Sequence, residues 1–167
     1  MSILVTGGAG FIGSQLLRTL SKFGERIVCI DNLSYAGVRG NVIEPVKHYQ
    51  IDICDKYAVE YVFDKEKFDT VFHLAAESHV DNSIKDCSPF LHTNIIGTVN
   101  LLQLGLKYEI DRFMHISTDE VFGSIDEGEF NEDSKYDPRN PYSASKAASD
   151  HFVQAFHNTY GLPTTIT

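Results

Sequence analysis

A glycine-rich turn near the N-terminus constrains the fold of this 167-residue chain more than any other feature. In the sequence TGGAGFIG, Gly7, Gly10 and Gly13 follow a short apolar run and open a stretch of helical character. Glycine allows a tight turn between strand and helix, lets the backbone approach a pyrophosphate, and lets the helix pack closely on the strand. This context favours a dinucleotide-binding turn over a glycine-rich turn that binds nothing.

Apolar runs and helical stretches alternate along the rest of the chain. The runs expected to form strands are residues 3–5, 26–30, 48–51, 70–74, 112–117 and 164–167. The stretches expected to form helices are residues 11–22, 57–67, 88–107 and 143–160, and a polar loop covers residues 123–141. Strands that alternate with helices form right-handed βαβ units. We therefore expect an α/β, doubly wound Rossmann fold: one domain over residues 1–167, with a mostly parallel sheet and helices on both faces.

The composition argues against several classes of protein. The formal net charge of −9 disfavours nucleic acid and anionic membranes as partners. No run approaches the roughly 20 apolar residues that span a bilayer. Cys29, Cys54 and Cys87 are widely spaced and the histidines lack metal-ligand spacing, so we expect no disulfide framework and no metal. The N-terminus has no basic segment ahead of an apolar run, and we expect a cytoplasmic protein.

Two aspartates follow predicted strands. Asp31 ends the second strand, about 20 residues after the glycines. A carboxylate at this place accepts hydrogen bonds from the adenosine ribose and repels a 2′-phosphate, so NAD is favoured over NADP. The alternative for Asp31 is a solvated loop residue. Asp52, after the third strand, is explained equally well by contact with the adenine or by solvation.

Tyr142 and Lys146 form a YxxxK pair at the start of the last predicted helix. Residues one helical turn apart share a face. A neighbouring ammonium and a positive nicotinamide favour the phenolate, so we expect the pKa of Tyr142 to lie below its usual value near 10. The pair then acts as a base that deprotonates an alcohol while a hydride leaves for the cofactor.

A polar cluster comes after the fifth predicted strand. Thr118, Asp119 and Glu120 follow Ser117, at the carboxyl edge of the sheet where such folds place their ligands. A hydroxyl here can orient a substrate alcohol, and two carboxylates can divide acid and base roles. Acidic residues also suit the first turn of a helix, and spacing alone favours this capping interpretation.

The stretch at residues 88–107 carries apolar side chains on more than one side. A helix on a sheet needs only one apolar stripe. The excess indicates a second buried face, for which we favour a subunit interface over a covering loop.

Seven segments resemble one known family. TGGAGFIGS, DNLSYAG, DIC, HLAAESHVDNSI, TNIIGT, HISTDEVFG and PYSASKAASDH are together similar to the dTDP-glucose 4,6-dehydratases, which are extended short-chain dehydrogenases/reductases. The resemblance spans nearly the whole chain. HISTDEVFG and AAESHVD distinguish this family from related sugar-nucleotide epimerases, which usually lack the Asp-Glu pair.

The resemblance implies a redox-neutral cycle on dTDP-glucose with NAD. In that cycle Tyr142 takes the proton of the C4 hydroxyl, Glu120 removes the C5 proton, and Asp119 protonates the departing C6 hydroxyl. Lys146 lowers the pKa of the tyrosine and binds the nicotinamide ribose, while Ser78 and Thr118 contact the sugar. The implied NAD site comprises Gly7, Gly10, Phe11, Ile12, Gly13, Asp31, Asn32, Leu33, Ser34, Asp52, Ile53, Leu74, Ala75, Ala76, Thr93, Tyr142 and Lys146. The resemblance also implies a homodimer through the helices that start near Ser88 and Ser143.

The sequence departs from the family pattern in length. The resemblance implies that members continue for about as many residues again, in a smaller substrate domain. We expect this domain to be absent here, together with the substrate-contacting Asn shortly beyond the last strand. Residues 38–46 also form a shorter stretch than in typical members. The alternatives are an NAD-binding fragment without turnover, a UDP- or GDP-sugar dehydratase, and a C4 epimerase.

Overall fold

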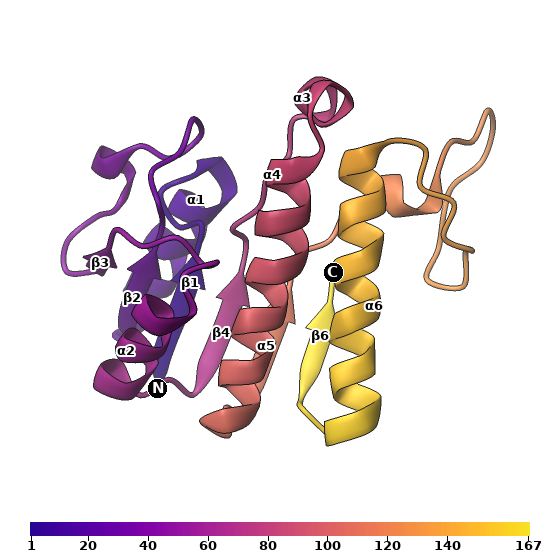
Figure 1. The fold of residues 1–167 in the computed structure, drawn as a ribbon. Coiled ribbons are helices and arrows are strands. Elements are labelled where there is room, and N and C mark those ends of the chain that lie inside the picture. Colours follow the sequence, from indigo (N-terminus) through magenta and orange to yellow (C-terminus); the bar gives the residue numbers. More distant parts are fainter.

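A computed structural model describes residues 1–167 and shows one parallel sheet (Figure 1). Its six strands lie in the order β3-β2-β1-β4-β5-β6, and every neighbouring pair is parallel. The strands are β1 (Ser2–Thr6), β2 (Arg26–Ile30), β3 (Lys47–Tyr49), β4 (Thr70–His73), β5 (Arg112–His115) and β6 (Thr164–Ile166). The strand order reverses between β1 and β4, which is the switch point of a doubly wound sheet. The predicted Rossmann fold is confirmed.

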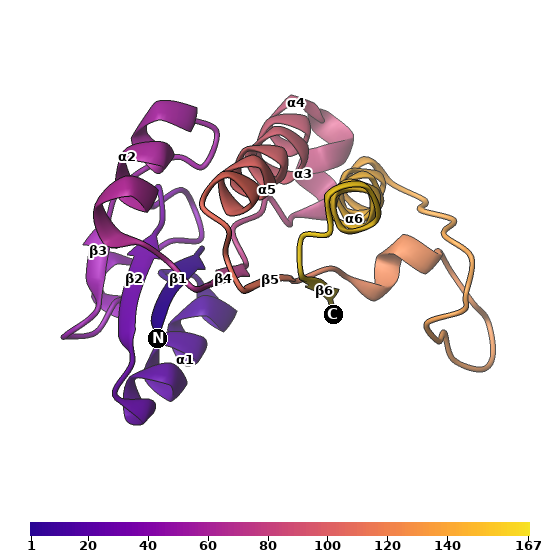
Figure 2. The same cartoon turned by 90° about the horizontal axis from the view of Figure 1, so that it is seen from below.

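Helices cover the two faces of the sheet unequally (Figure 2). One face carries α1 (Phe11–Leu20), whereas α2 (Lys56–Glu66), α5 (Thr98–Lys107) and α6 (Pro141–Tyr160) lie on the other. The remaining helical segments are η1 (Ser21–Phe23), η2 (Arg39–Asn41), α3 (Val80–Lys85), α4 (Ser88–Phe90), η3 (Leu91–Gly97) and η4 (Asp119–Phe122). None of the helices is long and apolar enough to cross a membrane.

Two apolar cores follow from the alternation of side chains along the strands. Leu4 and Val28 point into the larger core, which joins the sheet to α2, α5 and α6. Ile3 and Ile27, their neighbours in sequence, point into the smaller core with Leu17 of α1. The strands are therefore apolar on both sides, and the sheet fixes the positions of the loops at its carboxyl edge.

The boundaries of α6 follow from its end residues. The Asn140 side chain accepts a hydrogen bond from the Ser143 N–H at 2.8 Å, and the Ser143 hydroxyl completes a capping box with the Asn140 N–H. Pro141 occupies the first turn, where its missing N–H costs nothing. The helix therefore starts two residues before the predicted Ser143, and it ends at Gly161 in the left-handed region (φ 71°).

Three features differ from the prediction. The six-residue α3 was not expected, because VDNSIK is too short and polar to show an apolar period. The stretch at residues 88–107 is helical throughout but contains a π-helical segment, η3. The fifth strand ends at His115 rather than at Ser117, and η4 forms at residues 119–122.

Candidate functional site

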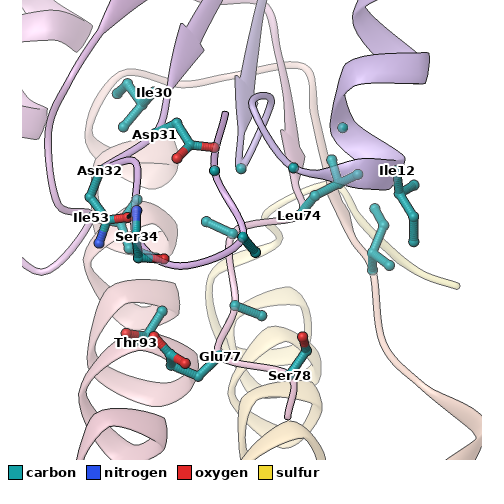
Figure 3. Close-up of a pocket in the computed structure, with 18 of the residues that line it drawn as sticks. Ile12, Ile30, Asp31, Asn32, Ser34, Ile53, Leu74, Glu77, Ser78 and Thr93 are labelled. Carbon is teal, nitrogen blue, oxygen red and sulfur yellow. Dashed lines mark hydrogen bonds between the residues drawn. The ribbon is translucent and has the colours of Figure 1, made fainter. Parts of the chain in front are cut away.

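A cavity of about 380 Å³ opens at the carboxyl edge of the sheet, beside the switch point (Figure 3). Asp31 and Asn32 lie together at one end, and Glu77 and Ser78 lie apart from them. The predicted site residues that line the cavity are Gly7, Gly10, Phe11, Ile12, Gly13, Asp31, Asn32, Ser34, Asp52, Ile53, Leu74, Ala75, Ala76, Ser78, Thr93, Tyr142 and Lys146. Phe11 and Ile12 remain 93% and 63% exposed, so the mouth is open. The fold thus brings together the adenosine and nicotinamide ends of the predicted site.

The three motif glycines serve different purposes. Gly7 has a positive φ of 72°, and a Cβ there would lie 2.6 Å from the Ala75 nitrogen. A Cβ on Gly13 would lie 2.2 Å from the Gly7 carbonyl oxygen, so strand and helix could not pack. Gly10 has more room, with its nearest contact at 3.3 Å, and it begins α1 without a side-chain cap. Gly7 and Gly13 are therefore required by the fold, while Gly10 leaves the uncapped start of α1 open to an anion.

The Asp31 carboxylate ties two loops together at the edge of the cavity. One oxygen accepts a hydrogen bond from the Ala9 N–H at 2.9 Å, and the other accepts one from the Leu33 N–H at 2.8 Å. The side chain is buried, yet it lines the cavity. Because two carboxylate oxygens offer about four lone pairs, Asp31 retains acceptor capacity for ribose hydroxyls.

Leu33, which is also predicted to contact NAD, is not among the residues that line the cavity. Its backbone has a positive φ of 56°, and its N–H is directed at Asp31. Leu33 therefore contributes a main-chain donor that orients Asp31.

Tyr142 and Lys146 both line the cavity, one turn apart on α6. The Lys146 ammonium is 4% exposed and donates to the Ile116 carbonyl oxygen at 2.6 Å. Burial lowers the pKa of Lys146 to about 8, and the charge of Asp150 opposes this effect.

The pKa of Tyr142 is raised, in the opposite direction to the expectation. Burial of the phenol is the largest cause; a hydrogen bond with Thr118 lowers the pKa, while the charges of Glu120 and Asp119 raise it. Because the Lys146 ammonium donates to the Ile116 carbonyl oxygen, the protein by itself does not favour the phenolate form of Tyr142. A positive group beside the phenol has to shift the balance toward it.

Thr118, Asp119 and Glu120 lie next to Tyr142 but do not line the cavity. Thr118 caps η4, because its hydroxyl oxygen accepts a hydrogen bond from the Glu120 N–H at 3.3 Å. Thr118 is the N-cap, and Asp119 and Glu120 lie in the first turn of η4, as the capping interpretation expects. The carboxylates of both residues also raise the pKa of Tyr142. A Glu120 oxygen also accepts a hydrogen bond at 3.0 Å from the amide of Asn140, the N-cap residue of α6.

A buried polar chain supports the floor of the site. The Thr98 hydroxyl donates to the Asn94 carbonyl oxygen at 2.7 Å, so its oxygen is left to accept from Nε2 of His73 at 2.8 Å. Nδ1 of His73 then accepts the Thr6 hydroxyl proton, also at 2.8 Å. Burial holds the pKa of His73 well below its usual value, in agreement with a neutral ring.

The Asn94 side chain continues this support to α6. Its oxygen accepts from the Glu77 N–H at 2.8 Å, and its amide donates to the Ser145 hydroxyl at 2.8 Å. Asn94 thereby joins the loop after β4 to the helix that carries Tyr142.

The sequence analysis missed several cavity residues. They are Ile30, Ala36, Gly37, Ile51, Glu77, Ile116 and Ser117. Glu77, whose pKa is raised mainly by burial, lies within the AAESHVD segment and could have been found there. Ala36 and Gly37 lie likewise in DNLSYAG, and Ile116 and Ser117 lie in HISTDEVFG. Ile30 and Ile51 lie outside these segments and become recognisable only when the ends of β2 and β3 are brought to one edge. No group of three or more His, Cys, Asp or Glu is arranged to hold a metal ion.

Comparisons with known proteins place this dinucleotide-binding α/β domain in a family. The model of the family described as GDP-mannose 4,6 dehydratase matches residues 4–167, and the chain belongs to this family. It is 48% identical to the dTDP-glucose 4,6-dehydratase of Haemophilus influenzae, over 100% of this chain and 54% of that protein. It is 46% identical to the probable dTDP-glucose 4,6-dehydratase of Sinorhizobium fredii, over 99% of this chain and 52% of that protein. The resemblance predicted from the motifs is confirmed, and the chain spans about half the length of these relatives.

Solved structures agree with this assignment. The dTDP-glucose 4,6-dehydratase DesIV of Streptomyces venezuelae, with NAD and TYD bound, superposes with a TM-score of 0.94 and 42% identity. The UDP-glucose 4-epimerase of Thermus thermophilus, in complex with NAD, superposes with a TM-score of 0.95 and 36% identity. Each match covers 99% of this chain and 54% of the other. Epimerases and dehydratases thus share this half of the fold, and side chains have to distinguish them.

Proposed function

We propose that the protein carrying this chain is an NAD-dependent dTDP-glucose 4,6-dehydratase, a hydro-lyase. The observation that carries the proposal is the position of Asp119 and Glu120 beside Tyr142, at the edge of a cavity that begins with the glycine turn. A C4 oxidation alone needs the tyrosine, whereas the loss of water from C5 and C6 needs a further base and acid. The two carboxylates supply that second pair.

NAD suits the residues of the cavity. The uncapped start of α1, which has no acidic residue in its first turn, suits the pyrophosphate. Asp31 suits the adenosine ribose, and Lys146 and Tyr142 suit the nicotinamide end. When bound, NAD would supply the acceptor for a hydride from C4 of the sugar and, once reduced, the donor of a hydride to C6.

The chain's own residues perform the proton transfers in this proposal. Tyr142 accepts the proton of the C4 hydroxyl, and the Lys146 ammonium offsets the charge of the phenolate. The 4-keto group then acidifies C5, where Glu120 removes the proton. Asp119 protonates the departing C6 hydroxyl, and Thr118 and Ser78 orient the sugar.

The test uses the full-length protein with NAD and dTDP-glucose, followed by NMR of the sugar. We expect the 4-keto-6-deoxy product. Glu120→Gln should block the loss of water while C4 oxidation continues, so NADH absorbance accumulates. Glu127→Gln, in the exposed loop before α6, is the matched control and should turn over normally.

Other outcomes identify the alternatives. Turnover of UDP- or GDP-glucose in preference to dTDP-glucose would assign a dehydratase of another nucleotide. Inversion at C4 of the sugar without loss of water, little affected by Glu120→Gln, would identify a C4 epimerase. Tight NAD binding without any conversion would leave an NAD-binding module.

We also propose that a second copy of the protein packs against α6 and η3. The support is three half-exposed apolar side chains on these contacting helices: Leu91 (49%), Ile96 (48%) and Phe152 (42%). Replacing Ile96 and Phe152 by Glu should convert a dimer to a monomer in analytical ultracentrifugation. Ile125→Glu, equally exposed at 49% but in the loop before α6, should leave the dimer intact.

A further inference from the structure

Two buried ionisable residues beside the site have no part in the mechanism proposed above. Asp150 is 1% exposed and His115 is 0% exposed; His115 lies next to Lys146, and Asp150 lies next to His115. Asp150 is one helical turn beyond Lys146 on α6, so the two side chains share a face. A carboxylate at this depth is costly unless it has partners.

The contacts of Asp150 show what it holds. One of its oxygens accepts hydrogen bonds from the Ser117 hydroxyl and, at 3.0 Å, from the Tyr136 hydroxyl. The other oxygen lies 3.1 Å from Nε2 of His115 and has no other partner. Its charge is the one that raises the pKa of Lys146 against burial.

The surroundings of His115 decide where its proton lies. The Ser149 hydroxyl donates to the Lys146 carbonyl oxygen at 2.8 Å, so its oxygen, 3.2 Å from Nε2 of His115, is left to accept. The Asp150 oxygen on the same side is also an acceptor. Nδ1 of His115 has no partner, and an unpartnered lone pair costs less there than an unpartnered N–H. A proton on Nε2 is donated to the Ser149 oxygen, and the negative Asp150 oxygen 3.1 Å from the same nitrogen favours the proton there.

This proton has a consequence for Lys146. The ammonium lies 3.4 Å from Nε2 of His115, which cannot accept from it while protonated. The lysine is therefore left with the Ile116 carbonyl oxygen, at the end of β5 and on the cavity side.

We propose that Asp150 is a positioning residue: its carboxylate is the counter-charge of the Lys146 ammonium and fixes the His115 proton on Nε2, which directs the lysine to the cavity. The importance of that lysine rests on the function proposed above. The proposal itself concerns only the charge and direction of Lys146 in this chain.

Other titratable groups around the cluster do not supply the counter-charge. His73 on β4 packs against His115 at 5.3 Å between ring centroids, and burial keeps its pKa low. The pKa of His115 is also lowered, with burial the largest cause, so both rings are neutral near pH 7. Burial raises the pKa of Tyr136 to about 12, which keeps this phenol a neutral donor. Tyr142, on the same helix, is likewise neutral near pH 7, and the carboxylates of η4 raise its pKa.

The first experiment titrates Lys146 by NMR in the full chain with labelled lysine side chains, assigned with Lys146→Arg. The wild-type midpoint is expected at about 8. In Asp150→Asn it should fall by about one pH unit or more, because an opposite charge is removed while the shape is kept. Tyr136→Phe is the matched control: it removes one hydrogen bond to the carboxylate but keeps its charge, and its midpoint should stay near that of the wild type. An unchanged midpoint in Asp150→Asn would overturn the proposal.

The second experiment needs no variant at Asp150 and covers the case in which Asp150→Asn does not fold. Ring ¹⁵N shifts of wild-type protein, with His115→Gln for assignment, report which nitrogen carries the proton. A proton on Nε2 of His115 is expected, and a proton on Nδ1 would contradict the proposal. Neither measurement requires sugar turnover, so a protein that fails to make the 4-keto-6-deoxy product can still support or overturn the role of Asp150.

Discussion

The two halves of the candidate site are built in different ways. Around β1, α1 and β2, the cavity wall is main chain, held by glycine packing and by N–H groups that converge on Asp31. Around β5, η4 and α6, the wall is ionisable side chains whose protonation depends on their neighbours. The first half is set by steric fit and is ready for a ligand, whereas the charges of the second half can change when a ligand arrives.

The largest expected effect is a break in the steric half. Gly13→Ala puts a methyl group 2.2 Å from the Gly7 carbonyl oxygen, where only main chain can move. We expect at least about 3 kcal/mol of lost stability, measured by urea unfolding. Gly40→Ala meets no atom within 4 Å and should keep the wild-type stability.

Gly10→Ala separates ligand binding from folding in the main-chain half of the site. Its added methyl lies 3.3 Å from the Gly7 carbonyl oxygen, a tight contact that a small shift relieves, so the fold should survive, but the methyl covers the start of α1. We expect NAD affinity to fall by about tenfold or more in calorimetry, which corresponds to about 1.4 kcal/mol. A variant that bound NAD normally would show that the pyrophosphate does not approach this residue.

The next prediction tests the half built from ionisable side chains by measuring how stability changes with pH. The native pKa of Lys146, about 8, lies below the ordinary value of 10.5. Between these values the unfolded chain holds the proton and the native chain does not, so this group makes stability rise with pH. Relative to Lys146→Met, the wild type should gain up to about 1.4 kcal/mol per pH unit from pH 8 to about 10. A constant difference over this window would mean that the ammonium is not buried.

The next prediction concerns Asp31, where one substitution changes both the hydrogen bonds to main-chain N–H groups and the charge of the cavity wall. Asp31→Asn leaves one of two main-chain N–H groups facing an amide nitrogen, at a cost of about 1–3 kcal/mol in urea unfolding. The charge that repels a 2′-phosphate is also lost, so the preference for NAD over NADP should weaken in binding assays. Asn32→Asp, at the adjacent exposed position, should retain the preference.

The smallest effect concerns the cap of α6. Asn140→Ala removes the acceptor for the Ser143 N–H and should cost about 1 kcal/mol in thermal unfolding. Asn140→Ser keeps a capping oxygen but cannot donate to Glu120 as the amide does. It should therefore restore most of the stability while leaving Glu120 without that partner.

Local patterns explain which parts of the fold the sequence could predict. The glycine turn and the apolar runs of the strands depend on neighbouring residues, and the Tyr142–Lys146 pair needs only the helical repeat. Helix α3 has no such repeat. Strand β5 ends at His115 and not at the predicted Ser117, and η4 begins shortly afterwards at Asp119.

Contacts across the sheet could not be read from the sequence in the same way. The spacing indicated that Lys146 faces Tyr142, but not that the Ile116 carbonyl oxygen accepts a hydrogen bond from its ammonium. It also did not show that burial raises the pKa of the tyrosine, or that Leu33 supplies an N–H to Asp31. These depend on where residues distant in sequence meet at one edge.

The wide turn of η3 gives its helix two faces that a uniform α-helix would not have. A π-helical turn contains one residue more than an α-helical turn, so side chains beyond it are rotated by about 100°. Asn94, within the turn, bridges Glu77 and Ser145, while Leu101 and Leu104 farther along reach the large core. Deleting a single residue here would preserve helical hydrogen bonding, but the Asn94 bridge and the core contacts of Leu101 and Leu104 could no longer be made together.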